Sequence, residues 1–130
     1  MRSAQPYIYI EDCKENMKFY ADVFKGRLQN IQYADEKGKP LENGKFILHA
    51  ELVVGDQIIH FSDMFQPMKH GNHIQIVLKF DSENEIHTVY DQLVKNGVEK
   101  VPLQETFWNS IHGHLVDKNG ISWVLDYQKV

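Results

Sequence analysis

The 130-residue sequence has little cysteine, no long hydrophobic run and no concentration of positive charge. Its single cysteine, Cys13, cannot form an internal disulfide, which is typical of proteins from the reducing cytoplasm. The longest apolar runs fall far short of the roughly 20 residues that a membrane-spanning helix needs, and the start of the chain lacks the apolar stretch of a secretory signal. The net charge of −4 is mixed along the chain, without the basic stripe of a nucleic-acid-binding protein. These absences predict a cytoplasmic domain that binds neither membranes nor nucleic acid.

The chain repeats the order strand, helix, strand, strand, strand. Strands are expected where apolar and polar residues alternate, at 5–10, 27–34, 45–54 and 57–61, and again at 73–80, 99–105, 111–117 and 121–127. One helix is expected between the N-cap Asp12 and the C′ residue Gly26, and a second between the N-cap Ser82 and Asn96-Gly97. The sequence therefore predicts one α+β domain over residues 1–130, made of two βαβββ modules at about 5–62 and 72–128.

Residue parity along the expected strands separates an apolar face from a polar one. In the third strand, the apolar face is expected to hold Phe46, Leu48, Ala50, Leu52 and Val54. A solvated face would be rich in lysine and glutamate, whereas this polar face is rich in histidine, glutamine and tyrosine, a mixture that favours a semi-enclosed pocket. Its members are Gln5, Tyr7, Tyr9, His49, Glu51, His60, His73, Gln75, His112 and Ser122.

Several of these residues admit more than one interpretation. His49 and Glu51 are either a structural pair at the pocket wall or a catalytic dyad. His60 and His73 are either neutral pocket-lining groups, a general acid or base, or metal ligands. Phe107 and Trp108, in the loop before the penultimate strand, either anchor that loop in the core or form an aromatic lid over a flat ligand.

Several short segments, distributed over nearly the whole chain, resemble one family. They are Pro6-Tyr7-Ile8, residues 17–24, residues 48–52, Gly71-Asn72-His73, residues 102–108, Gly113, Asp117, Gly120 and Trp123. Together they resemble the vicinal-oxygen-chelate superfamily (glyoxalase/bleomycin resistance/dioxygenase) and, within it, the PhnB-like branch. The sequence departs from the family pattern at Lys118-Asn119, where a proline–aromatic pair is more usual, and at Ile111-His112.

The resemblance implies a curved sheet that forms a cup, with the helices on its outer face, and a homodimer. Metal-dependent members take one ligand from the first and last strands of each half, which corresponds here to Gln5, His60, His73 and Val124. Imidazole and amide groups can bind a divalent ion such as Ni, Zn, Mn or Fe, but Val124 cannot. The resemblance therefore implies an incomplete metal site.

The expected function is the binding of a small organic ligand in a polar-aromatic cup. The residues assigned to that cup are Tyr7, Tyr9, His49, Glu51, His60, His73, Gln75, Phe107, Trp108, His112 and Ser122. The alternative is a metal-dependent lyase, isomerase or dioxygenase that acts on a substrate with vicinal oxygens. No catalytic residue is assigned. Methyl transfer is not expected, because no glycine-rich strand-to-helix turn offers a nucleoside cofactor site.

Overall fold

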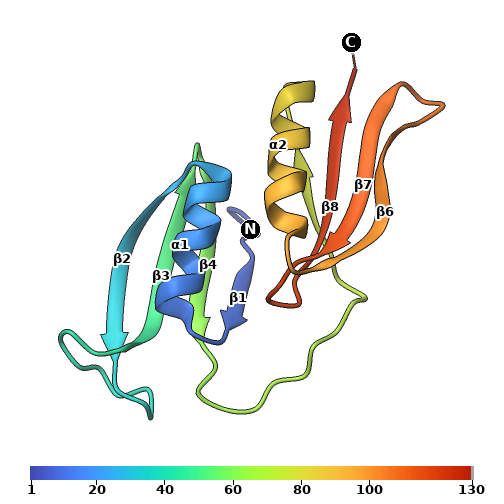
Figure 1. Cartoon of the computed structure of the whole chain (residues 1–130). Coiled ribbons are helices and arrows are strands. Elements are labelled where there is room, and N and C mark those ends of the chain that lie inside the picture. The colour runs from blue at the N-terminus through green and yellow to red at the C-terminus, as the bar shows by residue number, and fades with distance from the viewer. Residues whose placement is uncertain (130) are drawn as a thin grey trace. The chain divides into compact units, whose positions relative to one another are not determined.

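Residues 1–129 are described by a computed structural model, which divides the chain into a first unit, residues 1–68, and a second unit that begins at Lys69. Each unit is described by itself. Each consists of a four-stranded mixed sheet with one helix packed on one of its faces (Figure 1). The predicted α+β class and the repeated order of elements are confirmed.

The first unit builds its sheet around a central antiparallel pair. Its elements are β1 (Tyr7–Ile10), α1 (Cys13–Phe24), β2 (Arg27–Ala34), β3 (Phe46–Val54) and β4 (Gln57–Asp63). The strand order is β1-β4-β3-β2. The edge strand β1 runs parallel to β4, with Tyr7 opposite His60, so residues from the two ends of the unit lie side by side.

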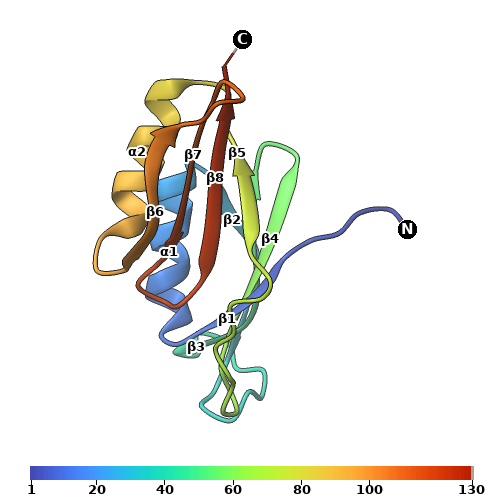
Figure 2. The same ribbon diagram turned by 90° about the vertical axis from the view of Figure 1, so that its right-hand side faces the viewer.

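The second unit repeats this arrangement. Its elements are β5 (Ile76–Lys79), α2 (Glu83–Val94), β6 (Val98–Glu105), β7 (Ser110–Val116) and β8 (Ser122–Gln128). The order is β5-β8-β7-β6, and β5 runs parallel to β8 (Figure 2). Among the described residues, neither helix is long and apolar enough to cross a membrane.

Each helix buries one apolar stripe against its own sheet. In α2 the stripe consists of Ile86, Val89, Tyr90 and Leu93, all buried, as the helical spacing predicts. In α1 the buried residues include Met17 and Tyr20, and the Tyr20 ring stacks on Phe61 of β4 at 5.3 Å between centroids. The opposite face of each sheet is therefore the one that can carry polar chemistry.

The two helices begin differently. The Ser82 hydroxyl caps α2 as predicted, accepting a hydrogen bond from the Glu85 amide at 3.1 Å. The corresponding prediction for Asp12 is wrong, because this residue is left-handed (φ 48°) and its side chain makes no capping bond. The Asp63 carboxylate, from the end of β4, accepts from the Cys13 amide instead, at 3.1 Å. A long-range contact thus replaces a local cap.

The glycine at the end of α1 has a different role from the one predicted. Lys25, not Gly26, adopts the left-handed conformation (φ 55°). Gly26 is required by close packing, since a Cβ atom there would lie 2.6 Å from the Val53 carbonyl oxygen.

Two predicted strands differ from the structure. In β3, Ile47 is fully buried whereas Phe46 and Leu48 are only half-buried, so the strict alternation predicted for this strand is wrong. The cause is an irregularity in the pairing with β2, whose register shifts between Gln32 and Tyr33. The strand predicted at 73–80 is confined to Ile76–Lys79, which leaves His73 in the preceding loop.

Candidate functional site

The open face of the first unit carries a continuous group of rings. Tyr7 and Tyr9 of β1 are 44% and 40% exposed, and their rings stack at 4.8 Å. The Tyr7 ring also stacks on His60 of β4 and on His49 of β3, at 5.6 Å in each case. We call these four residues, Tyr7, Tyr9, His49 and His60, the ring cluster. It offers planar, partly exposed surface of the kind that binds flat organic molecules.

A short hydrogen-bonded chain fixes both histidines of this cluster. His60 Nε2 lies 2.6 Å from the Gln5 amide oxygen, and His60 Nδ1 lies 2.8 Å from His49 Nε2. The Gln5 oxygen can only accept, so His60 Nε2 must carry the proton and His60 Nδ1 must be an acceptor. His49 then donates from Nε2 and keeps a lone pair on Nδ1. The two neutral rings satisfy the whole chain without an additional proton.

Glu51 of β3 is held by two amides that the sequence did not identify. Its Oε1 atom accepts from Gln29 Nε2 at 2.8 Å and from Asn30 Nδ2 at 2.9 Å. Asn30 is left-handed (φ 52°) at the irregular part of β2. These hydrogen bonds, and more weakly the nearby His60 and His49, hold the pKa of Glu51 below its usual value. The carboxylate is therefore charged at neutral pH.

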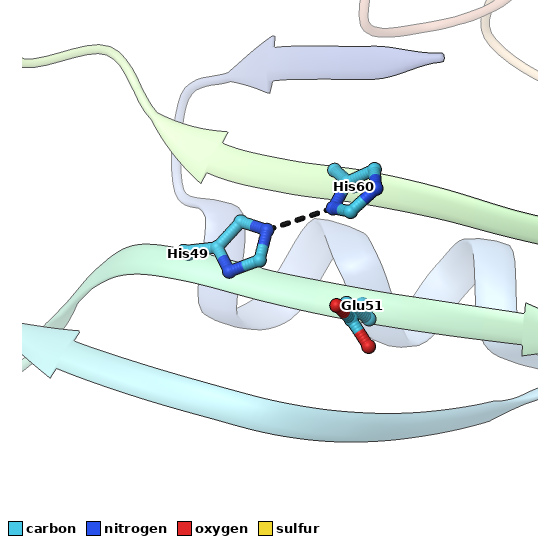
Figure 3. A group of neighbouring side chains, drawn as sticks. All are labelled: His49, Glu51 and His60. Carbon is cyan, nitrogen blue, oxygen red and sulfur yellow. Dashed lines mark hydrogen bonds between the residues drawn. The ribbon is translucent and has the colours of Figure 1, made fainter. Parts of the chain in front are cut away.

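His49, Glu51 and His60 together form a group that could hold a metal ion. One ligand atom from each lies within 4.8 Å of the others, and Figure 3 shows His49 and Glu51 on β3 beside His60 on β4. This group shares only His60 with the four positions that the family resemblance implies. Of those four, Gln5 is bonded to His60, His73 lies in the exposed loop before β5, and Val124 is a buried apolar residue of β8. The four family positions therefore do not provide a complete set of donors.

The open face of the second unit carries a second polar chain. Lys79 of β5 binds the Asp126 carboxylate of β8 at 2.6 Å, and the other Asp126 oxygen lies 3.2 Å from His112 Nδ1. His112 Nε2 lies 3.0 Å from His114 Nε2, and His114 Nδ1 lies 3.3 Å from the Gln75 amide oxygen. The sequence identified His112 and Gln75 as site residues but not Lys79 or Asp126, although Asp126 shares its strand parity with Ser122.

The two ends of this second chain both need a proton from a histidine. Asp126 and the Gln75 amide oxygen can only accept, so His112 donates from Nδ1 to Asp126 and His114 donates from Nδ1 to Gln75. The contact between the two Nε2 atoms then needs a third proton, which a neutral pair of rings does not have. Burial, and secondarily the charge of His112, lowers the pKa of His114 and favours its neutral form.

His114 also lines an open pocket of about 380 Å³ within the second unit. Its lining combines one cation with apolar and amide groups, from Asn72, Gln75, Lys100, Val101, His114, Leu115, Val116 and Ser122. Gln75 and Ser122, both assigned to the cup from the sequence, thus line the same pocket.

The lowered pKa of His114 has a measurable consequence for stability. The unfolded chain takes up a proton on this residue at a higher pH than the folded chain does, so its contribution to folding is lost as the pH falls below about 6.5. The variant His114→Gln should therefore lose less stability than the wild type between pH 7 and pH 5. Urea denaturation at a series of pH values measures this difference. The matched control is His87→Gln, on the exposed side of α2, and equal pH dependence in all three proteins would contradict the assignment.

The loop before β7 presents its aromatic residues to solvent. Phe107 is 96% exposed, so the interpretation of this side chain as a core anchor is wrong. Trp108 is half-exposed, and its ring meets Phe107 at 4.8 Å and His112 at 6.0 Å between centroids, both edge-on. Trp108 thus adjoins the second polar chain, whereas Phe107 extends beyond it.

Comparison with known proteins gives one family and one fold. The sequence model of the family described as 3-demethylubiquinone-9 3-methyltransferase matches residues 4–125. The chain is similar to the protein PA1353 from Pseudomonas aeruginosa, with 25% identity, a TM-score of 0.85 and 100% of each chain covered. A PhnB protein from Bacillus cereus is 24% identical over 97% of this chain and 99% of its own, with a TM-score of 0.79.

More distant structures share the fold alone. The fosfomycin resistance protein FosX from Listeria monocytogenes has 9% identity and a TM-score of 0.69, with 100% of this chain and 95% of that chain covered. No curated protein matches the sequence.

Proposed function

The chain belongs to the PhnB-like family, the one described as 3-demethylubiquinone-9 3-methyltransferase, within the vicinal-oxygen-chelate superfamily, and we propose that it binds a small, flat organic ligand on the ring cluster. The observation that carries this proposal is the stacking of Tyr7 on Tyr9, His49 and His60, with two tyrosine rings left more than one-third exposed. Clustered aromatic rings that stay exposed on a sheet face favour a binding surface over a core.

The polar groups around the rings define the ligand further. In the neutral chain of Gln5, His60 and His49, the His49 Nδ1 lone pair is an acceptor, and the Glu51 carboxylate adds a negative charge nearby. A ligand that donates hydrogen bonds, such as a phenol, a catechol or an aromatic amine, matches these groups, whereas an anionic ligand would be repelled. We therefore expect planar hydrogen-bond donors among the molecules that bind.

The test is a screen of planar aromatic compounds by ligand-observed NMR, followed by titration of the best compound. Replacement of Tyr7 by alanine should weaken binding about 2- to 12-fold, the equivalent of the 0.5–1.5 kcal/mol of one aromatic contact. Tyr33→Ala is the matched control, because this ring lies under Lys14 of α1, on the helix side of the sheet. Binding that is insensitive to Tyr7→Ala, or no binding at millimolar concentrations, would refute the proposal.

The alternative function is a metal-dependent lyase, isomerase or dioxygenase acting on vicinal oxygens. The group formed by His49, Glu51 and His60 favours it, since two imidazoles and one carboxylate are a common set of metal ligands. The apolar Val124 disfavours the family's four-ligand arrangement. We assign no methyl transfer, because residues 1–129 contain no glycine-rich strand-to-helix turn that could cradle a nucleoside cofactor.

We further propose that the chain is a cytoplasmic homodimer. The buried free Cys13 supports a reducing compartment. Each four-stranded sheet leaves two edges unpaired within its own unit, and such edges are usually covered. Light scattering on the purified chain tests the dimer, and a monomer at micromolar concentrations would contradict it.

A further inference from the structure

His60 presents its two ring nitrogens to different neighbours. Its Nε2 donates to the Gln5 amide oxygen at 2.6 Å, and the Gln5 amide nitrogen donates in turn to the Ser3 hydroxyl at 3.1 Å. The lone pair on His60 Nδ1 therefore points to the opposite side, where His49 lies 2.8 Å away (Figure 3). A metal on this side would meet a neutral imidazole whose other nitrogen already has a hydrogen-bond acceptor, the usual environment of a metal-binding histidine.

Glu51 is oriented in the same way. Both of its amide partners, Gln29 and Asn30, donate to Oε1, and neither bond uses Oε2. One carboxylate oxygen is thus held by the protein while the second stays available as a ligand. Outer partners of this kind fix the direction of a ligating carboxylate and are a feature of built metal sites.

The side chains of His49, Glu51 and His60 suit one divalent ion. Their ligand atoms lie within 4.8 Å of one another, and ligands of one tetrahedral zinc ion lie about 3.3 Å apart, given metal bonds of about 2.0–2.1 Å. The hydrogen-bonded nitrogens of His49 and His60, at 2.8 Å, would separate by about half an ångström to admit an ion between them. His49 would then carry its proton on Nδ1, since a ligating Nε2 must be unprotonated. The negative charge of Glu51 offsets part of the charge of the ion, which the neutral donors at the family positions could not do.

We propose that His49, Glu51 and His60 Nδ1 bind one divalent transition-metal ion within the first unit. Gln5, Gln29 and Asn30 are positioning residues that hold these ligands. Three protein ligands leave a fourth position of a tetrahedral ion open to water or another small molecule. This site does not depend on the proposed organic ligand, and it differs from the family positions in using His49 and Glu51 and no residue of the second unit.

The test uses the metal alone. Chelator-treated protein without an affinity tag is titrated calorimetrically with Zn²⁺ and, for a visible absorption spectrum, with Co²⁺; Mg²⁺, which prefers oxygen ligands, is the negative control. We expect one Zn²⁺ per chain and no heat with Mg²⁺. Glu51→Gln and His49→Ala should weaken Zn²⁺ binding more than 100-fold, whereas Gln5→Ala and Asn30→Ala should weaken it by roughly 10- to 100-fold, as the loss of outer partners does. His73→Ala and the surface control His87→Ala should leave it unchanged.

Three results would overturn the proposal. Loss of binding in Gln5→Ala and His73→Ala, with binding intact in Glu51→Gln and His49→Ala, would place the ion at the family positions. Equal binding by all variants would indicate adventitious surface binding only. No Zn²⁺ binding at micromolar concentrations would exclude a metal site. Circular dichroism identifies a variant that has not folded, and Glu51→Gln, a change of nearly equal shape at a half-buried side chain, keeps the test valid if His49→Ala is unstable.

Discussion

Replacing Asp117 by alanine should lower the free energy of unfolding by about 3–4 kcal/mol, because two backbone amides and one indole donate to this buried carboxylate. Its Oδ1 atom accepts from the amides of Asn119 and Ile121 at 2.8 and 3.1 Å, and its Oδ2 atom accepts from the Trp123 indole at 2.8 Å. Asp117 is 3% exposed and Trp123 is fully buried, so water cannot replace these bonds without opening the core of the second unit.

Urea denaturation followed by tryptophan fluorescence measures this effect directly. The sequence has two tryptophans, Trp108 and Trp123, and both belong to the second unit, so the signal reports that unit. Asp91→Ala, an exposed acidic residue of α2, is the matched control and should change stability by less than about 0.5 kcal/mol. Equal midpoints for Asp117→Ala and Asp91→Ala would show that the carboxylate is dispensable.

The second large effect is expected in the first unit, where Asp63→Ala should cost about 3 kcal/mol. The Asp63 carboxylate, 4% exposed, accepts from the Cys13 amide at the start of α1 at 3.1 Å and from the Ile47 amide of β3 at 2.7 Å. Its removal leaves two buried amide donors without their acceptor and breaks the hydrogen-bonded link from the start of α1 to β3 and β4.

Far-ultraviolet circular dichroism measures this loss across the whole chain, with Asp22→Ala, on the exposed side of α1, as the control. Comparing the unfolding midpoints from dichroism and from tryptophan fluorescence also tests whether the two units unfold together. A drop in the dichroism midpoint alone would show that the units unfold independently, and a parallel drop in fluorescence would show that they unfold together. An unchanged dichroism midpoint would contradict the role assigned to Asp63.

The features that the sequence predicted correctly have local causes. The stripe of Ile86, Val89 and Leu93 follows from the helical period, and the Ser82 cap from the capping-box spacing to Glu85. Both depend on residues within one or two turns of each other. The repeated order of helices and strands then allows the α+β class to be predicted from the sequence, because the pattern in each half supports the assignment of elements in the other.

The features that were missed depend on long-range contacts. Asp12 has the residue type of a helix cap, but Asp63, 50 residues further along the chain from Cys13, occupies the position where a cap would bind. The contact of Asn30 with Glu51 arises from a strand irregularity that parity rules do not include. Asparagine inside a strand is uncommon and tolerates left-handed backbone, which was the one available signal.

The sequence predicted which residues lie on the polar face, but not which of them form hydrogen bonds with one another. Parity placed Tyr7, Tyr9 and His60 on one face, and the structure shows their rings in contact. Parity also placed Asp126 beside Ser122, yet only the register of β7 and β8, which sets His112 opposite Asp126, shows that the acid orients a histidine. Residue types therefore indicate a site, whereas the pairing register decides which residues act together.

The parallel pairing of the first strand in each unit also sets an order of assembly. β1 pairs with β4, and β5 pairs with β8. The first strand of each unit can therefore join its sheet only after the last strand of that unit has been synthesised. During synthesis the first sheet can close once Asp63 has been made, before any residue of the second unit exists. Bringing together two strands so far apart in the chain is slow compared with helix formation. We therefore expect the pairing of the last strand to limit the folding rate of each unit. The chain can thus mature as two successive steps, the N-terminal half first.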